Sequence, residues 1–138
     1  MIDPSQRLVP STAPEDHPIH DAAESGDLAR VRTFLDRRPS LVHDINRAGG
    51  HPLHRAVVGR SANVVRLLLD RGADIHARDR EFDSTPLAWA ARAGREDMVR
   101  FLLSRGASVV HPDDEPWATP AAWARRRNHA NLVSILGG

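Results

Sequence analysis

The chain has 138 residues, which is enough for one domain with a single core. It contains no cysteine, which excludes disulfides, thiolate metal sites and cysteine nucleophiles, and all of its 19 basic residues are arginine. The formal net charge of +1 provides no whole-protein field that would select nucleic acid or an anionic membrane.

Residues 1–16 are rich in proline and polar side chains, which predicts a flexible leader. The leader lacks the basic and apolar regions of a signal peptide, and no apolar run reaches the roughly 18 residues of a membrane span. We therefore expect a soluble, cytoplasmic protein, and the arginine-only composition favours a bacterial origin. Leu8 and Val9 are candidates for a partial cap over the structure that follows.

From residue 17 onward the sequence repeats itself every 34 residues. Proline, alanine, valine and a large apolar residue each recur at this interval. The recurring positions are Pro18, Pro52, Pro86 and Pro120; Ala22, Ala56, Ala90 and Ala124; Val31, Val65, Val99 and Val133; and Phe34, Leu68, Leu102 and Leu136. Such matched series indicate copies of one structural unit. We place the four copies at residues 17–50, 51–84, 85–118 and 119–138.

Each unit is predicted to contain two short helices. In the third unit Thr85 is a candidate N-cap, Pro86 suits the first helical position, and "LAWAARA" forms a first helix that ends at Gly94. The second helix, "EDMVRFLLSR", has acids in its first turn, and Gly106 supplies a left-handed stop. Because one unit cannot bury its own apolar face, the units must stack.

The segments "TPLAWAARAGREDMVRFLLSRGAS" and "HPLHRAVVGRSANVVRLLLDRGADIHARD" resemble the ankyrin repeat, whose pattern opens T-P-L-H-x-A. The resemblance covers residues 17–138. It implies an all-α solenoid of four stacked helix-turn-helix units with extended finger loops, in which the terminal repeats act as caps. The period exceeds the family's roughly 33 residues within the fingers. Phe82 and Pro116 stand where we place the finger glycine, so we expect atypical turns there.

The tetrapeptides "HPIH" and "HPLH" raise the possibility of a metal site. His20 and His54 occupy the H of T-P-L-H, and the resemblance implies that they hydrogen-bond loop backbone. His17 and His51 would lie in adjacent repeats, about 10 Å apart, which is long for sharing one ion. With no well-placed carboxylate evident beside them, we expect no metal and no cofactor.

No catalytic or nucleic-acid motif emerges. We find no nucleophile elbow, Gly-rich phosphate loop or H-E-x-x-H, so we expect that the protein is not an enzyme. The basic segment "ARRRNH", residues 124–129, is best explained by the exposed outer face of a last repeat, because no basic stripe accompanies it elsewhere. We therefore expect no nucleic acid and no membrane among the partners.

Aromatic side chains gather in the second half of the chain. Trp89 and Trp123 share a column on the first helices, which in ankyrin repeats borders the concave groove. Trp117 lies near the tip of the third finger, and Phe82 lies close to the equivalent place on the second. Two interpretations overlap: the indoles are semi-buried framework, or they form an aromatic strip that anchors a partner.

Charge differs between the fingers and the second helices. A row of arginines on the second helices predicts a solvated convex face. The fingers are acidic, which implies a partner with basic or mixed-charge residues around an apolar knob. The arginines are Arg66, Arg71, Arg100 and Arg105, and the acids are Asp79, Glu81, Asp83, Asp113, Asp114 and Glu115.

The sequence thus predicts a non-catalytic protein-protein interaction module, a monomer on its own, that binds another protein through the fingers and the concave first-helix surface of repeats 2 to 4. The alternative is a small-molecule or enzymatic site between the third finger and the Trp89/Trp123 strip, with Asp113, Asp114 or Glu115 as polar groups. The predicted contact residues are Phe82, Trp89, Arg92, Asp113, Glu115, Trp117, Trp123 and Arg126.

Overall fold

A computed structural model describes residues 17–59, 61–112 and 114–137. The leader, with the candidate cap residues Leu8 and Val9, lies outside the described residues. Within these ranges the regular structure is entirely helical, which confirms the all-α prediction. None of the helices in this part of the chain is long and apolar enough to cross a membrane.

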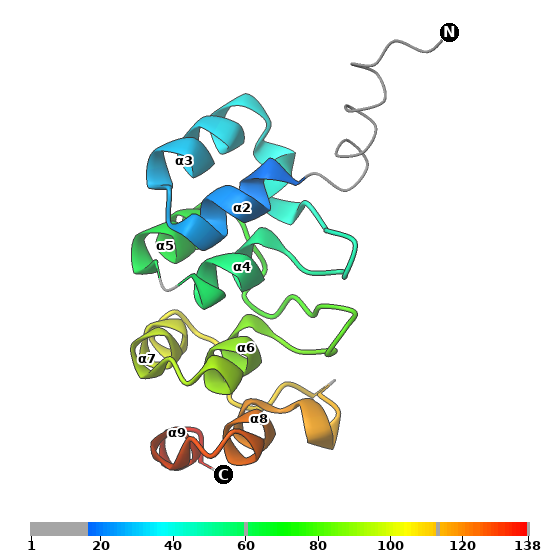
Figure 1. Cartoon of the computed structure of the whole chain (residues 1–138), viewed down its shortest axis with the longest axis vertical. Helices are drawn as coiled ribbons and strands as arrows, with labels where there is room; N and C mark the ends of the chain where they lie inside the picture. Colours follow the sequence, from blue (N-terminus) through cyan, green and yellow to red (C-terminus); the bar gives the residue numbers. More distant parts are fainter. Residues whose placement is uncertain (1–16, 60, 113, 138) are drawn as a thin grey trace, which may run out of the picture.

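The helices form two parallel rows, with the extended finger loops beside the inner row (Figure 1). The inner helices are α2 (Pro18–Ser25), α4 (Pro52–Val58), α6 (Pro86–Ala93) and α8 (Pro120–Arg126). The outer helices are α3 (Leu28–Arg37), α5 (Ala62–Asp70), α7 (Glu96–Ser104) and α9 (Ala130–Ile135). Two 3-10 turns, η1 (Pro39–His43) and η2 (Pro116–Ala118), interrupt the loops. The pairs stack as an ankyrin-type solenoid.

Helix α6 begins and ends as the sequence predicts. The Thr85 hydroxyl accepts a hydrogen bond from the backbone in the first turn of α6, and Pro86 occupies the first helical position. Gly94 ends α6 at φ 74°. Thr119 caps α8 in the same way, and Asn128 takes the left-handed position after it at φ 62°. The same local chemistry therefore builds both units.

Small residues let the inner helices approach closely. The alanines of the recurring column, such as Ala56, Ala90 and Ala124, are completely buried between neighbouring helices. Gly59, at the end of α4, has an ordinary φ of −74°. A Cβ at this position would lie 2.0 Å from the backbone oxygen of Glu24 in α2. Glycine is therefore needed here for close approach of two backbones.

Ion pairs between successive units run along the outer row. Arg71 of the second unit lies 2.8 Å from the carboxylate of Asp36 in the first. Arg105 of the third unit makes the same 2.8 Å contact with Asp70 of the second. The predicted convex arginine face is thus partly engaged by acids from the preceding unit.

The fingers turn in three different ways. Gly49 supplies a left-handed residue in the first finger, at φ 80°. In the second finger Asp83 takes this place at φ 48°, one position after Phe82, where we had expected the irregularity. The Arg78 guanidinium donates to both oxygens of Asp83, at 3.1 and 3.0 Å. The third finger instead forms the short helix η2, which begins at Pro116.

Candidate functional site

The buried carboxylate of Asp79 organises the second finger. One oxygen accepts hydrogen bonds from the Ser84 backbone and the Trp89 indole, each at 3.0 Å. The other accepts a 2.8 Å hydrogen bond from the Phe82 backbone. Asp79 is only 2% exposed. It therefore holds the finger against α6 and is not available to a partner.

Phe82 lies between the two tryptophans of the inner row. Its ring centroid is 6.0 Å from that of Trp89 and 5.5 Å from that of Trp123, both in edge-to-face geometry. The Trp123 indole donates to the Ser84 hydroxyl at 2.9 Å, and that hydroxyl donates to the Phe82 carbonyl at 2.8 Å. Phe82 is thus folded back from the finger tip, and the half-buried indoles are held within the framework.

Two arginines of the inner row lie against this aromatic cluster. The guanidinium carbon of Arg92 is 4.5 Å from the Phe82 ring centroid and 5.3 Å from that of Trp123. The Arg126 guanidinium carbon is 4.2 Å from the Trp123 centroid, and the group donates to the Trp117 carbonyl at 2.5 Å. Trp117 itself is 48% exposed. The structure therefore brings six of the eight predicted contact residues into one cluster of contacts.

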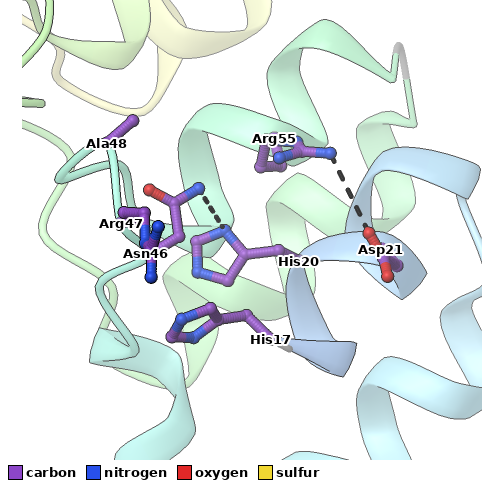
Figure 2. A pocket seen from close by; sticks show the side chains of 7 residues that line it. All are labelled: His17, His20, Asp21, Asn46, Arg47, Ala48 and Arg55. Atoms are coloured by element: carbon purple, nitrogen blue, oxygen red, sulfur yellow. Dashed lines mark hydrogen bonds and ion pairs between the residues drawn. The ribbon is translucent and has the colours of Figure 1, made fainter. Parts of the chain in front are cut away.

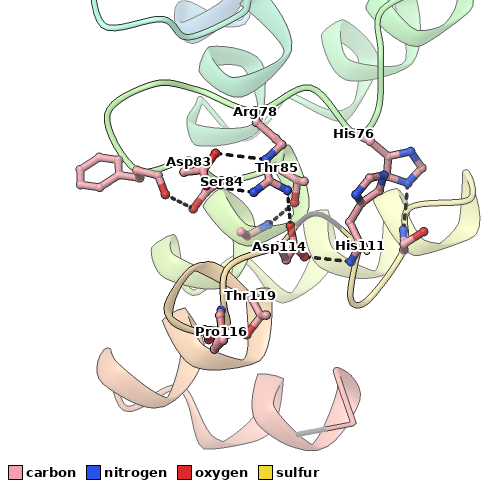
Figure 3. A network of polar contacts seen from close by, with 12 residues as sticks. His76, Arg78, Asp83, Ser84, Thr85, His111, Asp114, Pro116 and Thr119 are labelled. Carbon is pink, nitrogen blue, oxygen red and sulfur yellow. Dashed lines mark hydrogen bonds and ion pairs between the residues drawn. The ribbon is translucent and has the colours of Figure 1, made fainter.

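The acids of the third finger are arranged differently from one another (Figure 3). Asp114, with a side chain only 2% exposed, accepts a 2.7 Å hydrogen bond from Arg78 of the second finger and a 2.9 Å bond from the His111 backbone. Its carboxylate therefore fastens two fingers together. Glu115 is exposed at the start of η2. Asp113, another predicted contact residue, lies outside the described residues.

The structure also contains a groove that the sequence did not predict. It encloses about 260 Å³ between the first two fingers and the inner helices, and its lining includes Asn46, His54, Arg55, Glu81 and Trp89. These residues come from three different units. Arg55 and Trp89 share one column of the repeat, but arginine and tryptophan have no side-chain chemistry in common, so this column did not point to the groove.

His54 holds the second finger from within the core. Its Nε2 bonds to the Ser84 carbonyl at 3.0 Å, and its Nδ1 accepts a 3.1 Å hydrogen bond from the His51 backbone. The neutral imidazole with a proton on Nε2 satisfies both contacts. Burial lowers the pKa of His54 from 6.5 to about 4. The structural role implied by the family resemblance is what the geometry shows.

The first histidine pair does meet a carboxylate, which the sequence had not revealed. His17 Nδ1 lies 2.6 Å from Asp44, and the potential ligand atoms of His17, His20 and Asp44 all lie within 4.8 Å of one another. Figure 2 shows the Asn46 amide directed at His20 Nδ1, a 3.4 Å contact, and Arg47 lines the same pocket.

The hydrogen bonds of His20 weigh against metal binding at this cluster. Its Nε2 lies 2.6 Å from the Asp44 carbonyl, while Nδ1 faces the Asn46 amide, so both ring nitrogens are engaged. Burial lowers the pKa of His20, in keeping with a neutral ring. Only His17 and the Asp44 carboxylate remain as ligands, fewer than the three protein ligands of a typical zinc site. The geometry is that of a loop tether.

Comparison with known families identifies the chain. A family model described as ankyrin repeats (3 copies) matches residues 6–79, more than half of the chain, and a second, described as ankyrin repeats (many copies), matches residues 61–103. A comparison with curated proteins found no match. Ankyrin repeats generally serve as protein-protein interaction modules and are typically not enzymes. The stacked helix pairs, the capped helices α6 and α8 and these two matches together show that the chain belongs to the ankyrin repeat family.

Proposed function

We infer that the protein binds a partner protein through the finger loops and the concave inner-helix surface of repeats 2 to 4, without catalysis. The observation that carries this proposal is the joining of Trp117, Trp123, Phe82 and two arginines into one surface. Tryptophan and arginine are the residues that most often dominate the energetics of protein interfaces.

The surface is already ordered before any partner arrives. The indoles of Trp89 and Trp123 are fixed by hydrogen bonds to Asp79 and Ser84, and Phe82 packs against both rings. Side chains that are already fixed lose little conformational entropy on binding. Trp117, at 48% exposed, is more exposed than Phe82, Trp89 or Trp123 and so has more of its ring left to bury. We therefore assign it the role of anchor.

The small-molecule alternative loses part of its support. Asp114, one of its proposed polar groups, is engaged by Arg78 and by backbone, and Trp89 and Trp123 use their indole N–H groups within the framework. Glu115 remains at the rim of the proposed protein-binding surface, exposed and next to Trp117 in sequence. We also keep the proposals of a cytoplasmic location and a monomeric free state.

The test is capture of partners on immobilised protein from the native cell lysate, identified by mass spectrometry. The test variant is Glu115→Ala/Trp117→Ala, and the matched control is Glu96→Ala/Arg100→Ala on the convex face, where the two side chains form an exposed ion pair. Circular dichroism verifies that both variants fold. We expect a protein that is retained by the native chain and the control and lost by the test variant. Retention by the test variant would contradict the proposed surface.

A further inference from the structure

The inner helices differ from unit to unit at one column in their last turn. Successive units carry Glu24, Val58, Arg92 and Arg126 at the same position, 34 residues apart. In the first half of the solenoid, Glu24 is neutralised by Arg55 of the next unit, which contacts it directly. At this column, positive charge therefore occurs in the third and fourth units.

The two arginines of the second half are positioned by rings. Both guanidinium carbons lie within 5.3 Å of the Trp123 centroid, and Arg92 also covers Phe82. A guanidinium over an aromatic face keeps its N–H donors in its own plane, at the edges of the contact. Arrangements of this kind hold a donor fork in place for a planar acceptor.

Neither arginine has an acidic partner among the residues that the structure describes. Arg126 donates to the Trp117 carbonyl, and the contacts of Arg92 in this part of the chain are with rings. The Nε of Arg92 is enclosed and has no acceptor within the described ranges, which is unfavourable for a buried N–H. By contrast, Arg78 and Arg105 are each paired with carboxylates. The charge of Arg92 and Arg126 is therefore available to a ligand.

Three of the nearby finger acids do not offset this charge, whereas Glu115 is exposed at the rim of the surface. Asp79 and Asp114 are buried and engaged by internal donors, and Asp83 is paired with Arg78. The carboxylates of Asp79, Asp83 and Asp114 are therefore paired with donors within the fingers. The partner expected from the acidic composition of the fingers, one with basic groups, is thus not the one that these contacts favour.

We propose that the concave surface of the third and fourth repeats recognises an acidic segment of the partner protein, whose carboxylates bind Arg92 and Arg126 on either side of an apolar contact with Trp123. This proposal rests on the proposed protein-binding function and names the chemistry of its partner. A carboxylate matches the planar donor fork of arginine with two parallel hydrogen bonds. Burial of the contact beside the rings of Phe82 and Trp123 strengthens those bonds by lowering the local dielectric.

The test uses the full chain and capped synthetic peptides of defined charge. The acidic probe is Glu-Glu-Leu-Glu-Glu-Leu, and its matched controls replace every Glu by Gln or by Lys. Inorganic phosphate and a single-stranded DNA oligonucleotide test for general anion binding. The readout is the NMR signals of the arginine Nε–H and tryptophan indole groups, among which the enclosed Arg92 Nε–H is an internal reporter.

We expect saturable shifts at Arg92, Arg126 and Trp123 with the acidic peptide alone. The variant Arg92→Gln/Arg126→Gln should weaken its affinity at least about tenfold, because two charge-assisted contacts are lost. The control Arg125→Gln/Arg127→Gln removes the same charge from exposed positions at the end of α8 and should bind almost as well as the native chain.

Several outcomes would overturn the proposal. Equal binding of the Gln peptide, equal losses in the two variants, stronger binding of phosphate or DNA, or no saturable shift would each show that acidic protein segments are not what this surface selects. Saturation by the Gln or Lys peptide with shifts at Trp117 and Trp123 would contradict only the acidic partner, because the surface would still bind protein segments. The capture experiment above judges the protein-binding function separately.

Discussion

Acidification should weaken the fold through His54. Its pKa is about 4 in the folded chain and 6.5 for an unperturbed histidine, because burial disfavours the charged ring. Protonation of Nδ1 would also direct a donor at the His51 backbone N–H, which now donates to that nitrogen. Between about pH 6.5 and about pH 4, His54 therefore binds a proton in the unfolded state and not in the folded state.

The sign and size follow from this difference. The stability contributed by neutral His54 is fully present above its unfolded pKa and is lost as pH falls from 6.5 toward about 4. The complete loss is about 3 kcal/mol at 1.36 kcal/mol per unit, of which about 2 kcal/mol falls between about pH 7 and about pH 5. The pKa values of His20 and His51 are also lowered by burial, so they act in the same direction.

Urea unfolding followed by tryptophan fluorescence measures this loss, since the His54 ring lies 5.2 Å from Trp89. The variant His54→Gln removes the titrating group, so its unfolding free energy should depend on pH less than that of the native chain by about 2 kcal/mol over the same interval. An NMR titration assigns the group directly. A His54 midpoint near 6.5, or equal pH dependence of the native chain and the variant, would refute the reasoning.

Further predictions concern the joints between units. Gly59→Ala should destabilise the chain by about 2 kcal/mol, because the new Cβ meets backbone that cannot move aside. Gly72→Ala, with open space around its Cβ but φ 96°, should cost only about 1 kcal/mol in the same urea titration. Arg78→Met should cost about 3 kcal/mol by leaving the buried Asp114 unpaired. Arg71→Met, at an exposed ion pair, should cost less than about 1 kcal/mol, and equal losses for the two arginines would contradict this assignment.

The sequence predicted those features that follow from local chemistry or from the repeat period. Thr85, Pro86 and Gly94 mark a helix by local rules of capping and backbone geometry, which need no knowledge of the neighbours. The stacking of the units followed from the spacing of the apolar columns, because each unit has one face to bury. The predicted aromatic and arginine residues of repeats 3 and 4 came together for the same reason: their columns adjoin on the inner helices.

Contacts between residues at different positions of the repeat could not be predicted from the repeat period. Asp44 reaches the first histidine pair, yet the next unit has Arg78 at the same position, so no series of acids marked it. Arg78 in turn joins Asp114, and this pair depends on how each finger bends. Composition correctly described the fingers as acidic, but it could not show that Asp79 points inward and accepts three hydrogen bonds.

The ion pairs of the outer row would allow further units to be inserted into the solenoid. Each pair joins an aspartate of one unit to an arginine of the next, and residues 51–84 carry both halves, Asp70 and Arg71. An in-frame duplication of these residues would present its arginine to the preceding unit and its aspartate to the following one. In the third unit Ser104 stands at the position of Asp36 and Asp70. A duplicated copy of residues 51–84 would therefore keep an ion pair at both of its joints, whereas a copy of the third unit would lack the aspartate.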